Sequence, residues 1–262
     1  MDEQPRTVVP GPKLIAFRII AGLFGALSIF SSIAFAIPAL TNEEDKVHSF
    51  HVLGSLPVFV LVTGVAMVVL AVRPTDVTAL RIAWAVTIGT VIASIMGEDF
   101  FSGSYYVAPI VLVLLTILAP TREGLLRFGS PSIALLSLAI LAAIPAIIYA
   151  WDNARIQPQV DPMNDMTGHW EFHHWTGSAG TALALVLVAA VVAFRQPGDR
   201  MWIWMAGLAA MLFGAAGVIF ADAGLYPSST GTSWGLLVVF VGLVYVAVAE
   251  ISDRTRVVEA PA

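Results

Sequence analysis

Hydrophobic residues occur in eight long runs separated by short polar segments. The runs cover residues 14–37, 51–72, 80–96, 105–120, 131–150, 175–194, 201–221 and 234–251. A helix needs about 20 apolar residues to cross the hydrocarbon core of a bilayer, whereas the strands of a membrane barrel would alternate apolar and polar residues. A helix also satisfies its own backbone hydrogen bonds in lipid. The pattern predicts an all-α, polytopic membrane protein with eight transmembrane helices, and the short run at 105–120 is its weakest signal.

The composition is typical of a membrane protein and limits the residue types that could carry out chemistry. Of the 262 residues, 58% are hydrophobic and only 12% are charged, against about 25% charged residues in a soluble domain. The chain has no cysteine, so any chemistry rests on histidine, carboxylate, tyrosine, tryptophan or methionine. The interiors of the runs hold almost no charge, which argues against a proton pump, a voltage sensor or a retinal protein. Nothing in the sequence indicates nucleic-acid binding.

Lysine and arginine are divided unequally between the two sets of alternate loops. One set, which includes both chain ends, holds 11 of these residues, and the other set holds only Lys46 and Arg155. Short loops rich in lysine and arginine stay in the cytoplasm. We therefore expect both termini to be cytoplasmic, in a multi-pass protein of the cytoplasmic (inner) membrane. All five histidines then lie on the extracytoplasmic side, at His48, His51, His169, His173 and His174.

Two segments of the chain resemble each other. The segments that begin at His51 and His174 both start with His-x-x-Gly-Ser, continue as an unbroken apolar run and end in arginine and proline. Four spans in each half would give both halves the same orientation, as in parallel repeats. We expect a cytoplasmic tail at 1–12, a first four-helix half at 13–121, a second half at 122–251 with an extracytoplasmic loop at 151–175, and a cytoplasmic tail at 252–262. The first run is too long for a signal-peptide core and predicts a retained helix.

The segment from His169 to His174, with the sequence HWEFHH, holds the densest candidate chemistry. In a helix, His169 and His173 are four residues apart and His48 and His51 three apart, so each pair could present two imidazoles to one metal ion. The candidate ligands of a transition metal (Fe, Cu or Zn) are His48, His51, His169, His173 and His174. Glu171 is the candidate catalytic residue, as a general base, a ligand or a partner that orients an imidazole.

A purely structural interpretation accounts for the same residues. Histidine and tryptophan sit comfortably at the headgroup level of a bilayer, so Trp151 and Trp175 could anchor the helices there. The small residues that follow His51 and His174 leave space either for a flat cofactor or for a closely packed helix. Acidic residues at this surface, such as Asp99, would then only solvate helix ends.

Eight spans in two parallel four-helix halves, with a histidine opening the second helix of each half, resemble the haem A synthases and related four-helix b-type haem proteins. The residues that carry the resemblance are His48, His51, Glu171 and His174. Val52 and Trp175 stand where that family's pattern has arginine, and the predicted fourth and eighth helices hold no histidine. The resemblance implies a haem b held by His51 and His174 across the two halves, or completed by methionine or water, without haem A synthase activity.

Three functions stay open. The first is redox or metal-dependent chemistry at a haem or transition-metal site on the extracytoplasmic face. The second is a carrier for a small neutral, lipidic or metal cargo, as the duplicated architecture and the prolines within the runs suggest. The third is a non-catalytic assembly or sensing protein that contacts a membrane protein partner or a second copy of itself. The sequence does not decide whether the protein is an enzyme.

Overall fold

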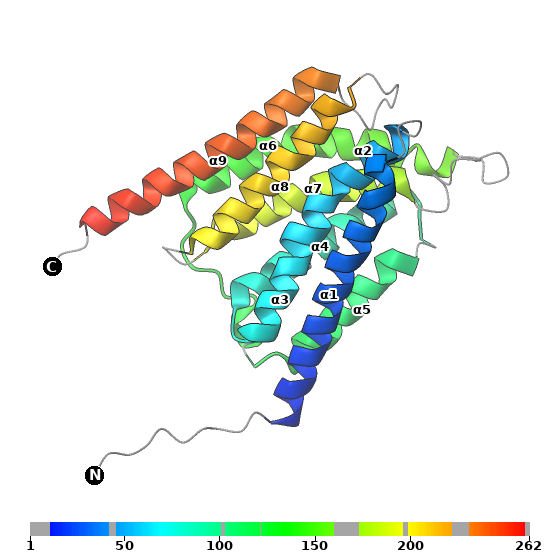
Figure 1. The fold of residues 1–262 in the computed structure, drawn as a ribbon. Coiled ribbons are helices and arrows are strands. Elements are labelled where there is room, and N and C mark those ends of the chain that lie inside the picture. Colours follow the sequence, from blue (N-terminus) through cyan, green and yellow to red (C-terminus); the bar gives the residue numbers. More distant parts are fainter. Residues whose placement is uncertain are drawn as a thin grey trace, which may run out of the picture.

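The computed structural model describes residues 11–41, 46–100, 103–120, 122–159, 173–195, 199–221 and 231–259, and these residues contain helices and no strands (Figure 1). The α-helices are α1 (Pro12–Thr41), α2 (Lys46–Leu56), α3 (Val65–Val72), α4 (Val77–Met96), α5 (Gly103–Leu118), α6 (Ile133–Ala154), α7 (His174–Val192), α8 (Arg200–Ile219) and α9 (Gly231–Glu259). Three other helical segments are the π-helix η1 (Pro57–Gly64) and the 3₁₀-helices η2 (Arg122–Gly124) and η3 (Gln157–Gln159).

Seven helices of the described chain are long and apolar enough to cross a membrane. One of them, Ser49–Val72, consists of most of α2 followed without a break by η1 and α3. The eighth predicted run is also helical, but α5 has only 16 residues, or about 24 Å, against a hydrocarbon core of about 30 Å. The protein is therefore a multi-pass helical membrane protein, and the count of eight spans stays a prediction.

The chain alternates between two ends of the bundle. The histidine end holds His51, His174 and Gly97, where the span Ser49–Val72 and α7 begin and α4 ends. The arginine end holds Arg73 and Arg195, where α3 and α7 end. We keep these two names because they describe the molecule without assigning a side of the membrane.

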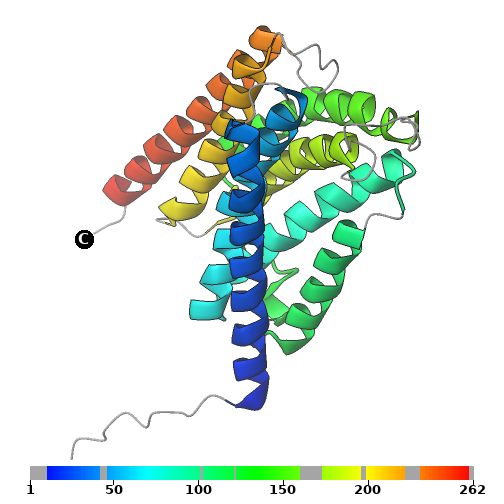
Figure 2. The same cartoon turned by 45° about the vertical axis from the view of Figure 1, so that its right-hand side comes forward.

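The helices near the middle of each half form the centre of the molecule. The most buried spans are Ser49–Val72, α4, α7 and α8, whereas α1, α6 and α9 are mostly exposed and carry large apolar side chains outward. In both views α1 runs along the outside, next to α3 (Figure 1, Figure 2). Exposed apolar faces of this kind are suited to lipid contact, because lipid tails are as apolar as the side chains.

The helices within each predicted half contact one another in the same pattern. In each half, consecutive spans contact each other and the first span also contacts the fourth, as α1 contacts α5 and α6 contacts α9. Between the halves, α4 packs along α7, and α2 with η1 packs along α8. Two parallel four-helix halves would have this pattern, although the duplication itself stays a prediction.

Glycines allow the closest helix contacts. A Cβ atom at Gly89 of α4 would lie 2.6 Å from the backbone nitrogen of Ala184 on α7. Between α8 and α9 the contact is reciprocal: a Cβ at Gly214 would lie 2.6 Å from the carbonyl oxygen of Gly235, and the reverse distance is also 2.6 Å. Small residues let membrane helices approach this closely, which maximises van der Waals contact between them.

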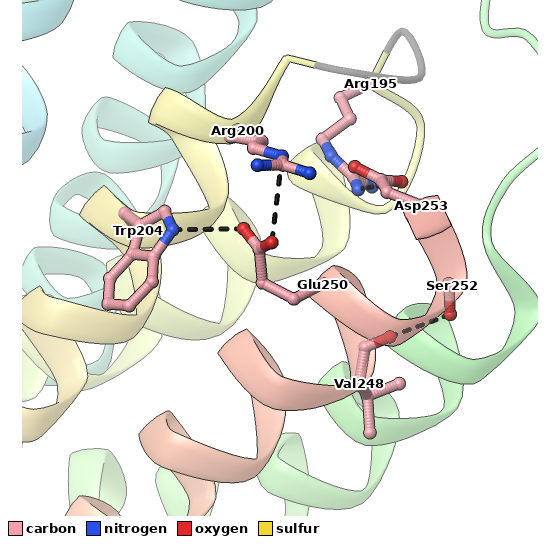
Figure 3. Close-up of polar contacts among 7 residues, drawn as sticks. All are labelled: Arg195, Arg200, Trp204, Val248, Glu250, Ser252 and Asp253. Atoms are coloured by element: carbon pink, nitrogen blue, oxygen red, sulfur yellow. Dashed lines mark hydrogen bonds and ion pairs between the residues drawn. The ribbon is translucent and has the colours of Figure 1, made fainter. Parts of the chain in front are cut away.

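Polar contacts tie α9 to its neighbours at the arginine end (Figure 3). Arg195, just after α7, lies with its Nη2 2.8 Å from Oδ1 of Asp253 on α9, and both side chains are buried. Glu250, one turn earlier, accepts a hydrogen bond from Nε1 of Trp204 and lies 3.7 Å from Nε of Arg200. The arginine end of α9 is therefore fixed to both α7 and α8.

Candidate functional site

Two of the predicted histidines meet at the histidine end. His51, at the start of the second span, and His174, the first residue of α7, stack with their ring centroids 4.9 Å apart and their planes 20° from parallel. Trp175 packs edge-on against His51 at 5.1 Å, and Phe50 packs against it at 5.7 Å. His51 is only 4% exposed. The stack joins the first half of the chain to the second inside an aromatic enclosure.

A row of neighbouring side chains leads from this stack into the second half. Nδ1 of His51 lies 2.9 Å from the hydroxyl oxygen of Ser178 on α7. Ser178 also lies close to the hydroxyl of Tyr149 on α6. The ring of Tyr149 packs edge-on against Phe213 of α8, at 5.8 Å. Side chains from three spans thus form one continuous polar connection.

His173 forms a separate centre with Asp99. Nδ1 of His173 lies 2.8 Å from Oδ2 of Asp99, and the two side chains are 19% and 6% exposed. The imidazole and the carboxylate are therefore in direct contact, as in a charge pair when the histidine is protonated. The sequence interpretation of Asp99 as a residue that only solvates a helix end is wrong, because its side chain is buried against a histidine of another span.

The backbone at the start of α7 explains why adjacent histidines have different neighbours. His173 adopts a left-handed conformation with φ of 51°, which is uncommon for a residue other than glycine. The helix then begins at His174, without a cap from the side chain of His173. Instead, Oε1 of buried Gln157 accepts hydrogen bonds from the backbone nitrogens of Trp175 and Thr176. This cap holds the first turn of α7 in place next to His174, which is half-buried.

The predicted metal site is only partly within the described chain. His169 and Glu171 lie outside the described residues, and so does the side chain of His48. The pairs His169 with His173 and His48 with His51 are therefore still predictions. Among the described residues, no group of three histidine or acidic side chains is arranged to hold a metal ion.

The geometry of the stacked pair bears on the predicted haem. Two axial imidazoles of one haem point a nitrogen at the iron from opposite faces, at about 2 Å each, with the macrocycle between the rings. The rings of His51 and His174 instead pack face to face, 4.9 Å apart, which leaves no layer for a macrocycle. Their arrangement does not fit a haem shared between the halves.

An apolar cavity of about 380 Å³ lies between α6, α7, α8 and α9, and we call it the slot. Its walls are mostly alanine, leucine, valine and glycine, and its polar side chains include Tyr149, Asp152 and Tyr245. The lining residues extend from Leu138 to Asp152 on α6 and from Trp234 to Tyr245 on α9, which corresponds to about 21 Å and 16 Å of helix. The volume is within the range of ligand pockets, about 300–1,000 Å³, and its shape is long and narrow.

The slot opens on the outer surface of the bundle. Ile148 on α6 and Trp234 and Leu237 on α9 line it and are also strongly exposed. α6 packs mainly on α7, and α9 mainly on α8, so the two outer helices contact each other only sparsely. Pro145, which removes a backbone donor from the middle of α6, lies in the wall, as expected if a proline helps to open a cavity. The opening therefore faces the apolar surroundings of the spans.

Each end of the slot carries polar side chains. Tyr149 and Asp152, near the end of α6, are at the histidine end, and Asp152 lies 3.5 Å from Arg155. Tyr245 is at the arginine end, where its hydroxyl donates a hydrogen bond to the carbonyl of Ala189. The slot thus offers a polar group at each end and apolar walls between, and Tyr149 joins it to the stacked histidines.

These features define a class of protein: a multi-pass helical membrane protein with a histidine-rich polar centre at one end and an apolar slot among four spans. No family model, curated protein or solved structure gives a significant match to the chain. The assignment of a function therefore rests on the residues themselves.

Proposed function

We propose that the protein binds a single-chain amphipathic lipid in the slot and acts as a carrier for it within the membrane. The single observation that carries the proposal is the slot itself, an elongated apolar space that ends at Tyr149 and Asp152. The apolar chain of a ligand could move from the bilayer into the slot at little cost in free energy, because the slot walls are as apolar as the chain. A headgroup at the histidine end would meet the polar side chains.

The exposed rim of the slot supports access from the bilayer. Trp234 and Leu237 are among the exposed apolar residues of α9, so a ligand could pass between α6 and α9 without crossing water. In the orientation that we propose from the loop charges, the histidine end is extracytoplasmic. The headgroup would then lie at the extracytoplasmic surface and the tail would point toward the membrane centre.

Quenching of Trp234 tests lipid binding. The purified protein in lipid nanodiscs is titrated with a bromine-labelled fatty alcohol, and the contribution of Trp234 is taken as the difference between the wild type and Trp234→Phe. Ala142→Leu places a larger side chain in the slot, whereas Ala134→Leu makes the same change at an exposed position of the same helix, outside the slot. We expect saturable quenching in the wild type and in the Ala134→Leu variant, and its loss in the Ala142→Leu variant.

Quenching that rises in proportion to the bromine content of the bilayer, equally in all variants that retain Trp234, would show that Trp234 senses bulk lipid and would overturn the proposal. Transport is tested next, by the transfer of a fluorescent fatty alcohol between vesicles or leaflets with and without the protein. The Ala142→Leu variant should transfer no faster than empty vesicles.

A metal centre at the histidine end is a second candidate, favoured by the contact between His173 and Asp99. Carboxylates commonly hold the second nitrogen of a metal-binding imidazole in this way. His169 and Glu171 lie four and two residues before His173 in the sequence, and together with His48 they would complete the ligand set. Elemental analysis should find about one metal ion per chain in the wild type and a loss of it in His173→Ala. A protein that contains no stoichiometric Fe, Cu or Zn after growth with these metals would exclude this candidate.

A further inference from the structure

The slot presents a negative charge at its histidine end. Asp152, in the last turn of α6, lines the slot and has a side chain that is 30% exposed. Among the described residues that line the slot, it is the only charged one. Its ion-pair partner Arg155 is 59% exposed and is not part of the lining. A molecule in the slot therefore meets the carboxylate of the pair rather than the guanidinium.

The ion pair leaves Asp152 able to bind a second cation. Nη2 of Arg155 lies 3.5 Å from Oδ1 of Asp152, and a pair that is this exposed contributes little to stability because water screens it. A carboxylate has about four lone-pair sites for hydrogen-bond donors. An ammonium group in the slot can therefore bind Asp152 without displacing Arg155.

Aromatic side chains line the slot at the same end. They are Tyr149 on α6, Trp234 in the first turn of α9, and Phe213 on α8, whose ring lies 5.8 Å from that of Tyr149. The face of an aromatic ring attracts a cation, and tryptophan does so most strongly. The histidine end of the slot thus combines a carboxylate with aromatic rings, and this combination favours a cationic headgroup over an anionic one.

The segments that connect the spans at the histidine end are also acidic. Ten of the 18 acidic residues of the chain, but only two of its 13 lysines and arginines, lie in segments 42–48, 97–102, 152–173 and 220–230. Clustered charges of one sign raise the local concentration of ligands of the opposite sign. The histidine end therefore attracts a cationic headgroup and repels an anionic one.

We infer that the ligand of the slot is a single-chain amphiphile with a cationic amine headgroup, which Asp152 binds while the chain lies along the apolar walls. The inference rests on the proposed lipid binding and names the headgroup class. A charged group that leaves water needs a partner, because burying it alone is costly. Asp152 is that partner for an amine, whereas a carboxylate, sulfonate or phosphate would be buried beside a like charge.

Three probes of equal chain length test the headgroup: a bromine-labelled alkylamine, fatty alcohol and alkylsulfonate. Each is titrated into the protein in nanodiscs of uncharged phospholipid and followed by the quenching of Trp234. Each variant is compared with the wild type for the same probe, so differences in partitioning into the bilayer cancel. Asp152→Asn should weaken the amine about 10-fold, the lower limit for a hydrogen bond with a charged group. It should leave the alcohol unchanged and should not weaken the sulfonate.

Two matched variants separate direct recognition from other effects. Glu98→Gln makes the same change of charge at an exposed position of the histidine end outside the slot, and it should leave all three affinities unchanged because salt screens an exposed charge. Arg155→Gln breaks the same ion pair as Asp152→Asn but removes the competing cation, so it should strengthen the amine. A purely structural role of the pair predicts that both variants weaken every probe.

The outcomes distinguish the inference from the proposed function. Failure of all three probes to bind saturably would contradict lipid binding itself. Saturable binding of the alcohol would leave lipid binding intact and overturn the inference if Asp152→Asn weakened the amine no more than the alcohol. Equal weakening of the amine by Asp152→Asn and Glu98→Gln, or by Asp152→Asn and Arg155→Gln, would also overturn it.

Discussion

Removal of Arg195 should destabilise the protein more than removal of any surface arginine. The side chains of Arg195 and Asp253 are 4% and 7% exposed, and one contact of 2.8 Å joins them (Figure 3). Nε of Arg195 and Oδ2 of Asp253 have no hydrogen-bond partner among the described residues. Arg195→Ala would leave the carboxylate of Asp253 buried, charged and without this arginine.

The size of the effect follows from the geometry. Removal of one member of a buried ion pair typically costs about 3–5 kcal/mol. Because the pair has one contact and two unsatisfied atoms, we expect the lower value, about 3 kcal/mol. For a protein of this size, 1 kcal/mol shifts the melting temperature by about 2–4 °C, so Arg195→Ala should lower it by about 6–12 °C.

Thermal unfolding in nanodiscs, followed by tryptophan fluorescence, measures this shift. The matched control is Arg200→Ala, because Arg200 is 56% exposed and lies 3.7 Å from Glu250, where an ion pair contributes about 0–1 kcal/mol. The double variant Arg195→Met with Asp253→Leu replaces both charges by apolar groups and should melt near the wild type. Equal shifts for Arg195→Ala and Arg200→Ala, or a double variant as unstable as the single one, would refute the reasoning.

Three further changes test separate parts of the fold. Gly235→Ala puts a Cβ 2.6 Å from the carbonyl oxygen of Gly214 and should cost about 1–3 kcal/mol, whereas Gly129→Ala, in open space, should leave the melting temperature unchanged. Gln157→Ala removes the cap of α7 and should lower stability by about 0.5–2 kcal/mol, with greater hydrogen exchange at Trp175 and Thr176. Asp199 lies just before α8, where burial and then the charge of Asp76 raise its pKa above the ordinary 3.8. Its contribution to stability is therefore full below pH 3.8 and is lost as the pH rises through the raised pKa. Asp199→Asn should flatten this decline, and equal pH profiles for the two proteins would contradict the assignment.

The sequence predicted the helical fold well because hydrophobic length is a strong signal in a membrane protein. All eight apolar runs are helices, and most of their ends agree within a few residues. The differences have local causes. The first helix begins at Pro12 and continues to Thr41, beyond the apolar run, and α9 continues into a charged segment. Polar residues near helix ends extend a helix beyond its membrane-crossing part, so hydropathy alone does not mark where it stops.

The candidate site was less predictable because it depends on contacts between distant residues. The sequence indicated His51 and His174 as a matching pair, and the structure stacks them. It did not indicate Gln157, whose side chain caps a helix 18 residues away, or the contact between Asp99 and His173. Tyr149 could have been noticed as a polar side chain close to the end of an apolar run. However, tyrosine is also common there as an interfacial anchor, so its position does not indicate a site.

The small residues that follow His51 and His174 allow close helix packing, one of the two interpretations that the sequence left open. Gly54 lies against the ring of Phe213 on α8, and Gly180 lies against Thr90 on α4, where a Cβ would be 3.1 Å from the Cα of Thr90. Close helix packing therefore accounts for these two positions. Ser178 is an exception, because its hydroxyl contacts His51. A pattern of small residues predicts close approach, but it does not say which member also takes part in a polar contact.

One helix, α7, connects all parts of the proposed mechanism. It begins at His174, carries Ser178, forms one wall of the slot and ends near Arg195, which holds α9. Its close contact with α4 fixes it to the first half of the chain, so α7 is the rigid wall against which α6 and α9 would separate. α9 is held at the arginine end by Asp253 and Tyr245, whereas no comparable ion pair joins α6 to α9 among the described residues. A ligand should therefore enter near the histidine end, where its headgroup would reach Tyr149 first and its tail would follow into the slot.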